Sequence, residues 1–322
     1  MNRNPIQIRT DLEEHARDLG FIEFGIAPAE SLDEEASRLR DYLDLNYHGT
    51  MQWMAGNVQR RTDPKQVVPG AKSVIMVAYN YFTGRAPQEP WKAKISKYAW
   101  GDDYHDVVTP KVRSLEKSLH QLVDGSVRSR SYVDTGPIME KAWAARAGIG
   151  WIGKHTNLIH RDHGSWFFLG AIITDVELEY DSRLPDYCGS CTRCIDACPT
   201  DAIVDSYVLD SRKCLSYLTI EYRGDHFPEQ QAEHTEGWIY GCDICQEVCP
   251  WNNKFEHPTE DTHFTPRDEN VNRDLTEWLD LTEQEYRERF RKSPVKRAKY
   301  RGLMRNIRTA AAHQLTSEES EE

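Results

Sequence analysis

The chain has 322 residues, of which 39% are hydrophobic and 29% charged, and its formal net charge at pH 7 is -12. No apolar run is long enough to cross a bilayer, and the first residues lack the charged and then apolar pattern of an export signal. These features argue against a membrane protein and against a small secreted disulfide scaffold. We therefore expect a cytoplasmic monomer that makes no membrane contact.

The first 180 residues alternate predicted helices with predicted strands. Apolar residues at helical spacing cover residues 6–19, 107–123 and 138–147. Runs typical of buried or half-buried strands cover residues 21–26, 72–79, 130–133 and 166–176. Gly20 closes the first helix, and a Pro69-Gly70 turn precedes the second strand. The alternation predicts an α/β or α+β domain over residues 1–180.

All eight cysteines lie in the segment 188–249, in two runs with a single cysteine between them. The first run is Cys188-x2-Cys191-x2-Cys194-x3-Cys198, and the second is Cys242-x2-Cys245-x3-Cys249. A proline follows each run, and Cys214 stands alone. This spacing is typical of bacterial ferredoxins that carry two 4Fe-4S clusters.

Ferredoxin geometry also predicts how the ligands are shared. Three thiolates two residues apart can hold three corners of one cubane, while the fourth cysteine of each run points to the other cluster. The predicted quartets are Cys188, Cys191, Cys194 and Cys249 for one cluster, and Cys198, Cys214, Cys242 and Cys245 for the other. An insertion explains the distance between Cys214 and Cys242. Zinc is the alternative metal, but its sites favour separate Cys-x2-Cys pairs. Residues 181–252 are therefore predicted to form a ferredoxin-like domain.

Residues 253–322 are predicted to form a helical, basic region that ends in a disordered acidic tail from Ser317. No acidic residue occurs between Arg289 and Arg308, although the chain as a whole is acidic. The overall negative charge disfavours nucleic acid, because phosphates pair with Lys and Arg. The local run of positive charge nevertheless predicts an RNA contact, with an ordinary solvated surface as the alternative.

The usual nucleotide motifs are missing. No G-x-G-x-x-G follows a predicted strand, and the chain has no Walker A loop. The cobalamin motif Asp-x-His-x-x-Gly is only half present, because the segment 103–108 lacks its glycine. A histidine ligand to cobalt is therefore not expected.

Several segments, taken in order, carry a resemblance over the whole chain. They are Arg61-Thr-Asp-Pro64, Pro69-Gly-Ala-Lys-Ser-Val74, Lys97-Tyr-Ala-Trp-Gly-Asp-Asp-Tyr-His105, Val133-Asp-Thr-Gly-Pro137 and Arg146-Ala-Gly-Ile-Gly-Trp-Ile-Gly-Lys154. Together with the cysteine runs, they resemble the epoxyqueuosine reductases, which are related to reductive dehalogenases. The resemblance implies reduction of epoxyqueuosine to queuosine and water at the wobble position of tRNA. It also implies base-off cobalamin, two 4Fe-4S clusters and a low-potential electron donor.

The resemblance nominates Asp134 as the proton donor beside cobalamin. A carboxylic acid can donate a proton near neutral pH if burial raises its pKa. The alternative is that Asp134 caps a helix beginning near Pro137. Tyr104 and His105 are further candidates for lining the substrate pocket or delivering a proton, although a histidine at a helix start is often a capping or surface residue.

Further cofactor contacts are expected at Arg61, Lys154, Asn157, Gly241 and Cys242. Arg61 can instead be a solvated arginine, and the glycines at 148, 150 and 153 can serve simple turns. A glycine beside Cys242 allows close backbone approach to a corrin, which predicts that the second cluster lies nearest cobalt.

The predicted tRNA contacts are Lys296, Arg297, Lys299 and Arg301 on phosphates, with Tyr217 or Tyr222 stacking near the anticodon. Two other functions are considered. A corrinoid reductase of a small organic halide would need a closed apolar pocket and no affinity for tRNA. An electron carrier without catalysis would bind no cobalamin.

Overall fold

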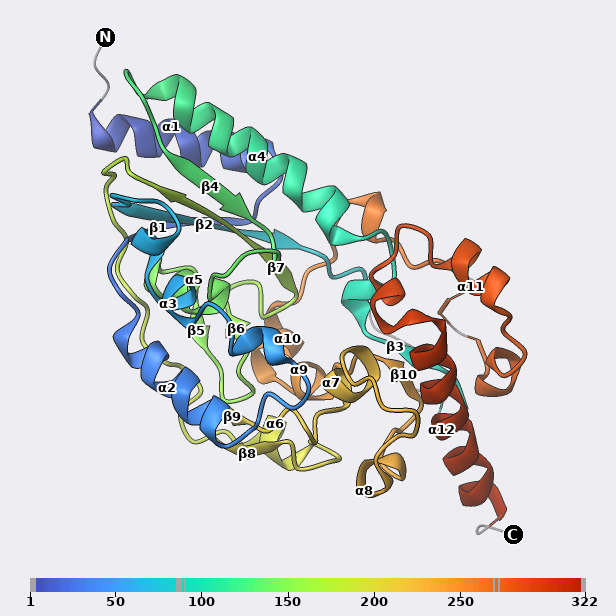
Figure 1. Cartoon of the computed structure of the whole chain (residues 1–322). Coiled ribbons are helices and arrows are strands. Elements are labelled where there is room, and N and C mark those ends of the chain that lie inside the picture. The colour runs from blue at the N-terminus through green and yellow to red at the C-terminus, as the bar shows by residue number, and fades with distance from the viewer. Residues whose placement is uncertain (1–3, 85–88, 90, 269, 272, 320–322) are drawn as a thin grey trace.

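The structure, a computed structural model, describes residues 4–84, 89, 91–268, 270–271 and 273–319 (Figure 1). Its main sheet has four antiparallel strands in the order β1-β2-β7-β4. They are β1 (Glu23–Pro28), β2 (Ser73–Asn80), β4 (Ser129–Tyr132) and β7 (Phe167–Thr174). β2 and β7 lie in the centre, and almost all of their residues are buried, which explains their continuous apolar sequence. Because all pairings within this main sheet are antiparallel, the fold is α+β rather than α/β.

Helices cover both faces of this sheet. α1 (Pro5–Asp18) and α4 (Tyr104–Leu122) lie together on one face, where Leu12 and Leu115 pack in one core with Ile172 (Figure 1). α5 (Glu140–Arg146) lies on the other face, where Trp143 packs in a second core with Met76. α2 (Asp33–Asp44) and α3 (Val58–Thr62) contact each other on that side. The sheet therefore separates two hydrophobic cores, one on each of its faces.

The helices and strands predicted in the first 180 residues are all present, with their ends displaced by a few residues. The largest displacement is at the start of α4, which begins at Tyr104 rather than at Val107. Asp103 causes it, because its Oδ1 accepts the backbone N–H of His105 at 3.1 Å and caps the helix. Tyr104 therefore lies in the first turn of a long helix, which fixes the direction of its ring.

The segment that carries the cysteines packs against the first domain through the insertion between Cys214 and Cys242. It contains α6 (Arg193–Asp196), the hairpin of β8 (Ile203–Asp205) and β9 (Val208–Leu209), α9 (Ile244–Glu247) and α10 (Pro250–Phe255). Between Cys214 and Cys242 lie α7 (Leu215–Ile220), α8 (Glu229–Ala232) and β10 (Trp238–Tyr240). β10 pairs in parallel with β3 (Lys94–Ile95), which precedes α4 in the chain.

The C-terminal region comprises the 3-10 turns η5 (Leu275–Trp278) and η6 (Pro294–Ala298), α11 (Glu283–Arg289) and α12 (Lys299–Glu319). Its core packs Trp278 and Ile307 against Ile95 and Tyr240, so residues from all three predicted domains contribute to it. α12 extends to Glu319, and the disordered acidic tail predicted from Ser317 stays a prediction. Residues 320–322 lie outside the described residues.

The remaining elements are short. They are η1 (Gln52–Met54), η2 (Pro64–Gln66), η3 (Lys97–Ala99), β5 (Trp151–Ile152), β6 (Leu158–Ile159) and η4 (Thr262–Phe264). Among the described residues, no helix combines the length and the apolar character that crossing a membrane requires.

Candidate active site and cysteine quartets

The eight cysteines are free thiols that surround two cavities. A cavity of about 600 Å³, called the main cavity below, is lined by Cys198, Cys214, Cys242 and Cys245. A second cavity of about 470 Å³, called the small cavity, is lined by Cys188, Cys191, Cys194 and Cys249. Each cavity thus gathers one of the quartets that the ferredoxin spacing predicts, including the exchange of Cys198 and Cys249 between the two runs.

The electrostatics of the thiols fit a positively charged metal centre. Burial first, and then Cys249 and Cys188, raise the pKa of Cys194 to about 11. Burial also raises the pKa of Cys242 and Cys245 well above the ordinary value, and neighbouring thiolates add to the effect. A quartet of thiolates is therefore unfavourable unless iron or another cation replaces the protons. The donor set of each cavity suits a 4Fe-4S cluster.

Buried polar contacts connect the second quartet to the first domain. Asp243, next to Cys242, accepts hydrogen bonds from the Ser96 hydroxyl and from the Lys97 backbone N–H, the latter at 2.8 Å. The Lys97 ammonium lies 3.6 Å from the same carboxylate and also pairs with Glu247. Burial raises the pKa of Asp243, while Lys97 acts in the opposite direction. This paired network fixes the Cys242–Cys245 loop against η3.

Asp134 lies in the main cavity, just after β4, with a left-handed φ of 55°. Its Oδ2 accepts the phenolic hydrogen of Tyr104 at 2.6 Å, and its backbone N–H donates to Glu140 Oε1 at 3.1 Å. Tyr104 stacks on Phe168 with ring centroids 4.3 Å apart. A non-glycine residue held at positive φ by two contacts is often found at a functional site.

The capping alternative for Asp134 is wrong. α5 begins at Glu140 rather than near Pro137, and Met139 occupies the N-cap position. The intervening residues form the turn that places the Asp134 carboxylate in the cavity. Gly136 belongs to this turn, and a Cβ there would lie 2.3 Å from the Tyr132 ring, so the turn requires glycine.

Two titratable side chains beside Asp134 were not predicted. Burial first, and then the charge of Asp134, raise the pKa of Glu140 to about 7. Burial lowers the pKa of Lys141, although nearby Cys245 and Asp134 favour its charged form. The Lys141 ammonium donates to Asn157 Oδ1 at 2.7 Å and to the Thr156 carbonyl at 3.2 Å. An acid and a base at the first turn of the helix predicted over 138–147 were the signal that could have identified them.

The other predicted cofactor residues divide into two groups. Asn157 and Cys242 line the main cavity. Lys154 lines the small cavity instead, because its ammonium donates to the carbonyls of Gly189 and Cys191 at 2.7 and 3.0 Å. Lys154 and Asn157 therefore face different cavities, because the chain reverses between β5 and β6, and their contacts with a cofactor stay predictions.

Arg61 and Gly241 are explained by local packing. The guanidinium of Arg61 donates to the Trp53 carbonyl at 3.1 Å and lies 5.2 Å from the centre of the Trp53 ring, so it supports a cavity wall. Gly241 has a φ of 71°, and a Cβ there would lie 2.4 Å from the Ser96 Cβ. Close approach to Ser96 thus requires this glycine. Gly150 has a similar reason, because a Cβ would lie 2.2 Å from the Ile159 carbonyl.

His105 lies beside the active-site tyrosine rather than among the residues that line the cavity. Its Nδ1 is 2.8 Å from Asp103 Oδ1, and its ring stacks on Tyr104 with centroids 4.1 Å apart. Burial acts to raise the pKa of Asp103, but the hydrogen bonds from His105 and Lys296 outweigh it and lower that pKa. His105 is not among the side chains that line the main cavity, and its position at the helix N-terminus matches the capping alternative, whereas its role in delivering a proton stays a prediction.

The basic segment lies at the rim of the main cavity, but it is not an unpaired patch. Lys296 lies 2.8 Å from Asp103, and Arg297 makes two hydrogen bonds of 2.8 and 2.9 Å to Glu221, which lines the cavity. Arg301 pairs with Asp225, whereas Lys299 is exposed. Acidic partners from distant parts of the chain therefore neutralise much of the charge that the sequence concentrates here.

The predicted stacking tyrosines are not free rings. Tyr217 is only 7% exposed, and its hydroxyl accepts the Thr50 backbone N–H at 2.8 Å. Tyr222 is half-buried, with the Arg305 guanidinium 5.1 Å from its ring centre. Trp53, which was not predicted, lines the main cavity and is 51% exposed. A tryptophan in the short segment between Gly49 and Gly56 was the available signal.

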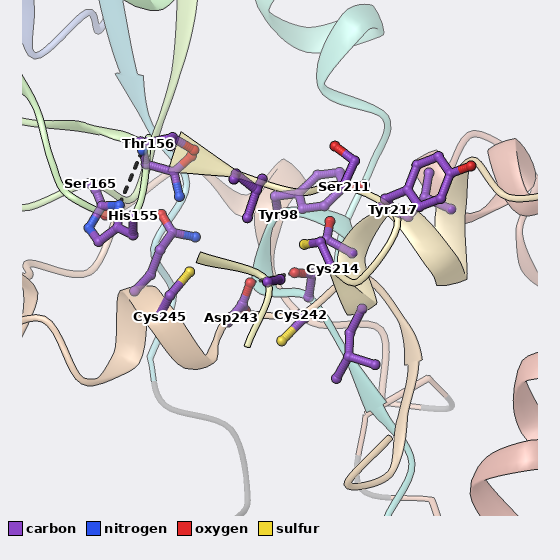
Figure 2. Close-up of a pocket in the computed structure, with 18 of the residues that line it drawn as sticks. Tyr98, His155, Thr156, Ser165, Ser211, Cys214, Tyr217, Cys242, Asp243 and Cys245 are labelled. Carbon is purple, nitrogen blue, oxygen red and sulfur yellow. Dashed lines mark hydrogen bonds between the residues drawn. The ribbon is translucent and has the colours of Figure 1, made fainter. Parts of the chain in front are cut away.

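Figure 2 shows the main cavity as an assembly of several chain segments. Cys214, Cys242 and Cys245 lie with Asp243 and Tyr98 near its centre, Tyr217 lies on one side, and His155 and Thr156 lie on the other. Burial first, and then the charge of Lys141, lower the pKa of His155 to about 4, so its ring is neutral at pH 7.

Two cysteine quartets beside a cavity that holds a positioned carboxylic acid define an iron-sulfur oxidoreductase. Two family models agree with this class. Residues 187–252 match the 4Fe-4S double cluster binding domain, and residues 61–135 match "Epoxyqueuosine reductase QueG, DUF1730". The chain belongs to the epoxyqueuosine reductase family.

Curated relatives support that membership along nearly the whole chain. The epoxyqueuosine reductase of Synechocystis sp. is 47% identical over 88% of this chain and 98% of its own length. That of Pseudomonas aeruginosa is 39% identical over 94% of this chain and 85% of its own. The predicted class of enzyme is thus confirmed, and the alternatives of a halide reductase and of a carrier without catalysis are not favoured.

Solved structures agree. A crystal structure of epoxyqueuosine reductase with an epoxyqueuosine-modified tRNA-Tyr stem loop has a TM-score of 0.87 and 32% identity, over 96% of this chain and 82% of that one. A Bacillus subtilis epoxyqueuosine reductase, whose catalytic aspartate loop is swung out of the active site, has a TM-score of 0.86 and 31% identity over the same shares of the two chains.

Proposed function

We propose that this chain reduces epoxyqueuosine in tRNA to queuosine, with Asp134 as the proton donor and with electrons that arrive through two 4Fe-4S clusters and base-off cobalamin. One observation carries the proposal: the main cavity unites Asp134 with the cysteine quartet Cys198, Cys214, Cys242 and Cys245. A proton source and an electron source therefore face the same space. The small cavity provides the place for a cluster that receives electrons from an external low-potential donor.

The lining of the main cavity suits the amide periphery of a corrin. Its hydroxyl and amide side chains include Thr156, Asn157, Ser165, Ser211, Ser216 and Gln246. Such groups both donate and accept hydrogen bonds, as carboxamides require. When bound there, cobalamin would supply a strongly reduced cobalt centre.

The proton chemistry follows from the contacts of Asp134. Reduction of an epoxide to an alkene and water consumes two electrons and two protons. Because Tyr104 donates to Oδ2, Oδ1 of Asp134 is the oxygen that carries the transferable proton. Glu140, whose pKa is about 7, holds another proton close by and binds the Asp134 backbone N–H.

The Glu140→Gln variant is expected to change the pH dependence of turnover. Glu140 is protonated below about pH 7 and ionised above it, where its charge faces Asp134 and is partly offset by Arg61. Wild-type turnover should therefore fall as pH rises from 6 to 8, whereas the permanently neutral glutamine should flatten that part of the profile. Single-turnover rates across this range measure it. Identical profiles for the two proteins would contradict a role for this proton.

Lys299 and Arg301 are the appropriate residues for testing phosphate binding, because changing Lys296 or Arg297 would break ion pairs with the largely buried Asp103 and Glu221, whereas the Asp225 partner of Arg301 is exposed. The Lys299→Ala/Arg301→Ala protein is expected to bind tRNA more weakly at fixed salt. The slope of log affinity against log salt should fall by roughly one for each phosphate that the variant no longer binds. Arg17→Ala is the matched control, since Arg17 is also exposed and ion-paired but lies on α1. Equal affinities in all three proteins would place the tRNA elsewhere.

The proposed reaction is tested by anaerobic reconstitution with iron, sulfide and cobalamin, followed by incubation with epoxyqueuosine-containing tRNA and a low-potential reductant. Mass spectrometry of the nucleosides should find queuosine only when cobalamin is present. Absence of conversion in a protein that has bound both clusters and cobalamin would overturn the substrate assignment.

A further inference from the structure

His155 occupies the wall that the two cavities share. It lies in the loop between β5 and β6, is only 3% exposed, and lines both the main cavity and the small cavity. A Cβ at Gly153 would lie 3.2 Å from its Cε1, so the ring is closely packed on that side. Figure 2 shows His155 among the side chains that surround the main cavity together with Cys245.

The hydrogen bonds of His155 define its tautomer. Nδ1 accepts the backbone N–H of Asn157 at 3.1 Å, so the proton of the neutral ring is on Nε2. Within the described part of the chain, Nε2 is buried and has no hydrogen-bond acceptor. Buried donors in folded proteins nearly always have acceptors, and a missing one indicates an ion or cofactor at that place.

The groups proposed for the cavities are rich in such acceptors. A 4Fe-4S cluster presents inorganic sulfides and cysteine sulfurs, and both carry negative charge. We propose that the Nε2–H of His155 donates a hydrogen bond to a sulfur of a 4Fe-4S cluster in one of the two cavities that share this wall. This hydrogen bond raises the reduction potential of that cluster. The inference rests on the two clusters of the proposed function.

The direction of the effect follows from charge. Reduction adds one negative charge to the cluster, so a hydrogen bond to its sulfur is stronger in the reduced state than in the oxidised state. The donor therefore stabilises the reduced cluster. His155 would act as a positioning residue for the electron, keeping it on the cluster that the ring contacts.

The first experiment detects the hydrogen bond in the unmodified holoenzyme. Protein labelled with ¹⁵N-histidine is reduced in steps, and pulsed electron paramagnetic resonance measures nitrogen couplings to each reduced cluster. We expect a ¹⁵N coupling in wild type that is absent from His155→Phe. The measurement is repeated in a Cys214→Ala protein, which retains only the cluster of the small cavity. This comparison decides which cluster carries the coupling. Wild-type enzyme without any histidine coupling would overturn the proposal, whether or not the variant assembles.

The second experiment measures the midpoint potentials of both clusters by redox titration. One of them should be more negative in His155→Phe than in wild type. Trp151→Phe is the matched control, because Trp151 packs with Cys188 and Cys249 of the small cavity, so only the cluster held there should respond. Unchanged potentials in His155→Phe with a full iron content would reject the inference. Neither readout depends on turnover, so failure of the tRNA reaction and failure of this inference are distinguishable.

Discussion

The Asp134→Asn variant should lose turnover while it keeps eight irons per chain, as two clusters of four, and binds cobalamin as wild type does. Asparagine has nearly the same shape, and its Oδ1 can still accept the Tyr104 hydroxyl that donates to Asp134 at 2.6 Å. The amide cannot supply a proton. General acids contribute roughly 10² to 10⁴ in rate, so we expect a loss of at least about 100-fold. Single-turnover formation of queuosine by the reconstituted enzyme measures it.

Tyr104→Phe provides the graded comparison. It removes the hydrogen bond to Asp134 but retains a ring that can stack on Phe168. Because Asp134 is neutral when it carries the transferable proton, the hydrogen bond contributes about 0.5–1.5 kcal/mol, so a loss of roughly two- to tenfold is expected, smaller than that of Asp134→Asn. Full activity of Asp134→Asn, with clusters and cobalamin bound, would remove Asp134 from the mechanism and leave Glu140 as the acid to examine.

Local features of the sequence were sufficient for the secondary structure and for the cysteine quartets. The runs in β2 and β7 are apolar because both faces of each strand are buried, and this composition is visible in one segment of about eight residues. The cysteine spacing reflects the shape of a cubane, so it predicted that Cys198 and Cys249 lie at opposite cavities. In both cases one short stretch carries the whole physical constraint.

Features that depend on partners far along the chain were not predictable in this way. Lys296 and Arg297 read as free charges until the fold brings Asp103 and Glu221 to them. Lys154 reads as a neighbour of Asn157 until the β5-β6 turn directs it to the other cavity. Sheet order has the same cause, since an alternation of helices and strands does not specify whether the strands pair in parallel or antiparallel.

Two double variants should decide whether the two cysteine runs exchange ligands. If Cys198 and Cys214 serve one cluster, the Cys198→Ala/Cys214→Ala protein loses two ligands from that cluster and keeps the other intact. The Cys194→Ala/Cys198→Ala protein then loses one ligand from each cluster and retains no complete 4Fe-4S cluster. If each run instead binds its own cluster, these two outcomes are reversed. Spin counting on the reduced 4Fe-4S signals, with iron and sulfide analysis, distinguishes one intact cluster from none.

The structure favours the exchange on two grounds. Cys198 and Cys214 line the main cavity, whereas Cys194 and Cys249 line the small cavity. The thiol of Cys198 also accepts the Ala202 backbone N–H at 3.2 Å, which holds it on that side. Because the main cavity also contains Asp134, the Cys198→Ala/Cys214→Ala protein should form no queuosine although it keeps one intact cluster. Turnover at the wild-type rate in that protein would show that electrons reach the substrate without the second quartet.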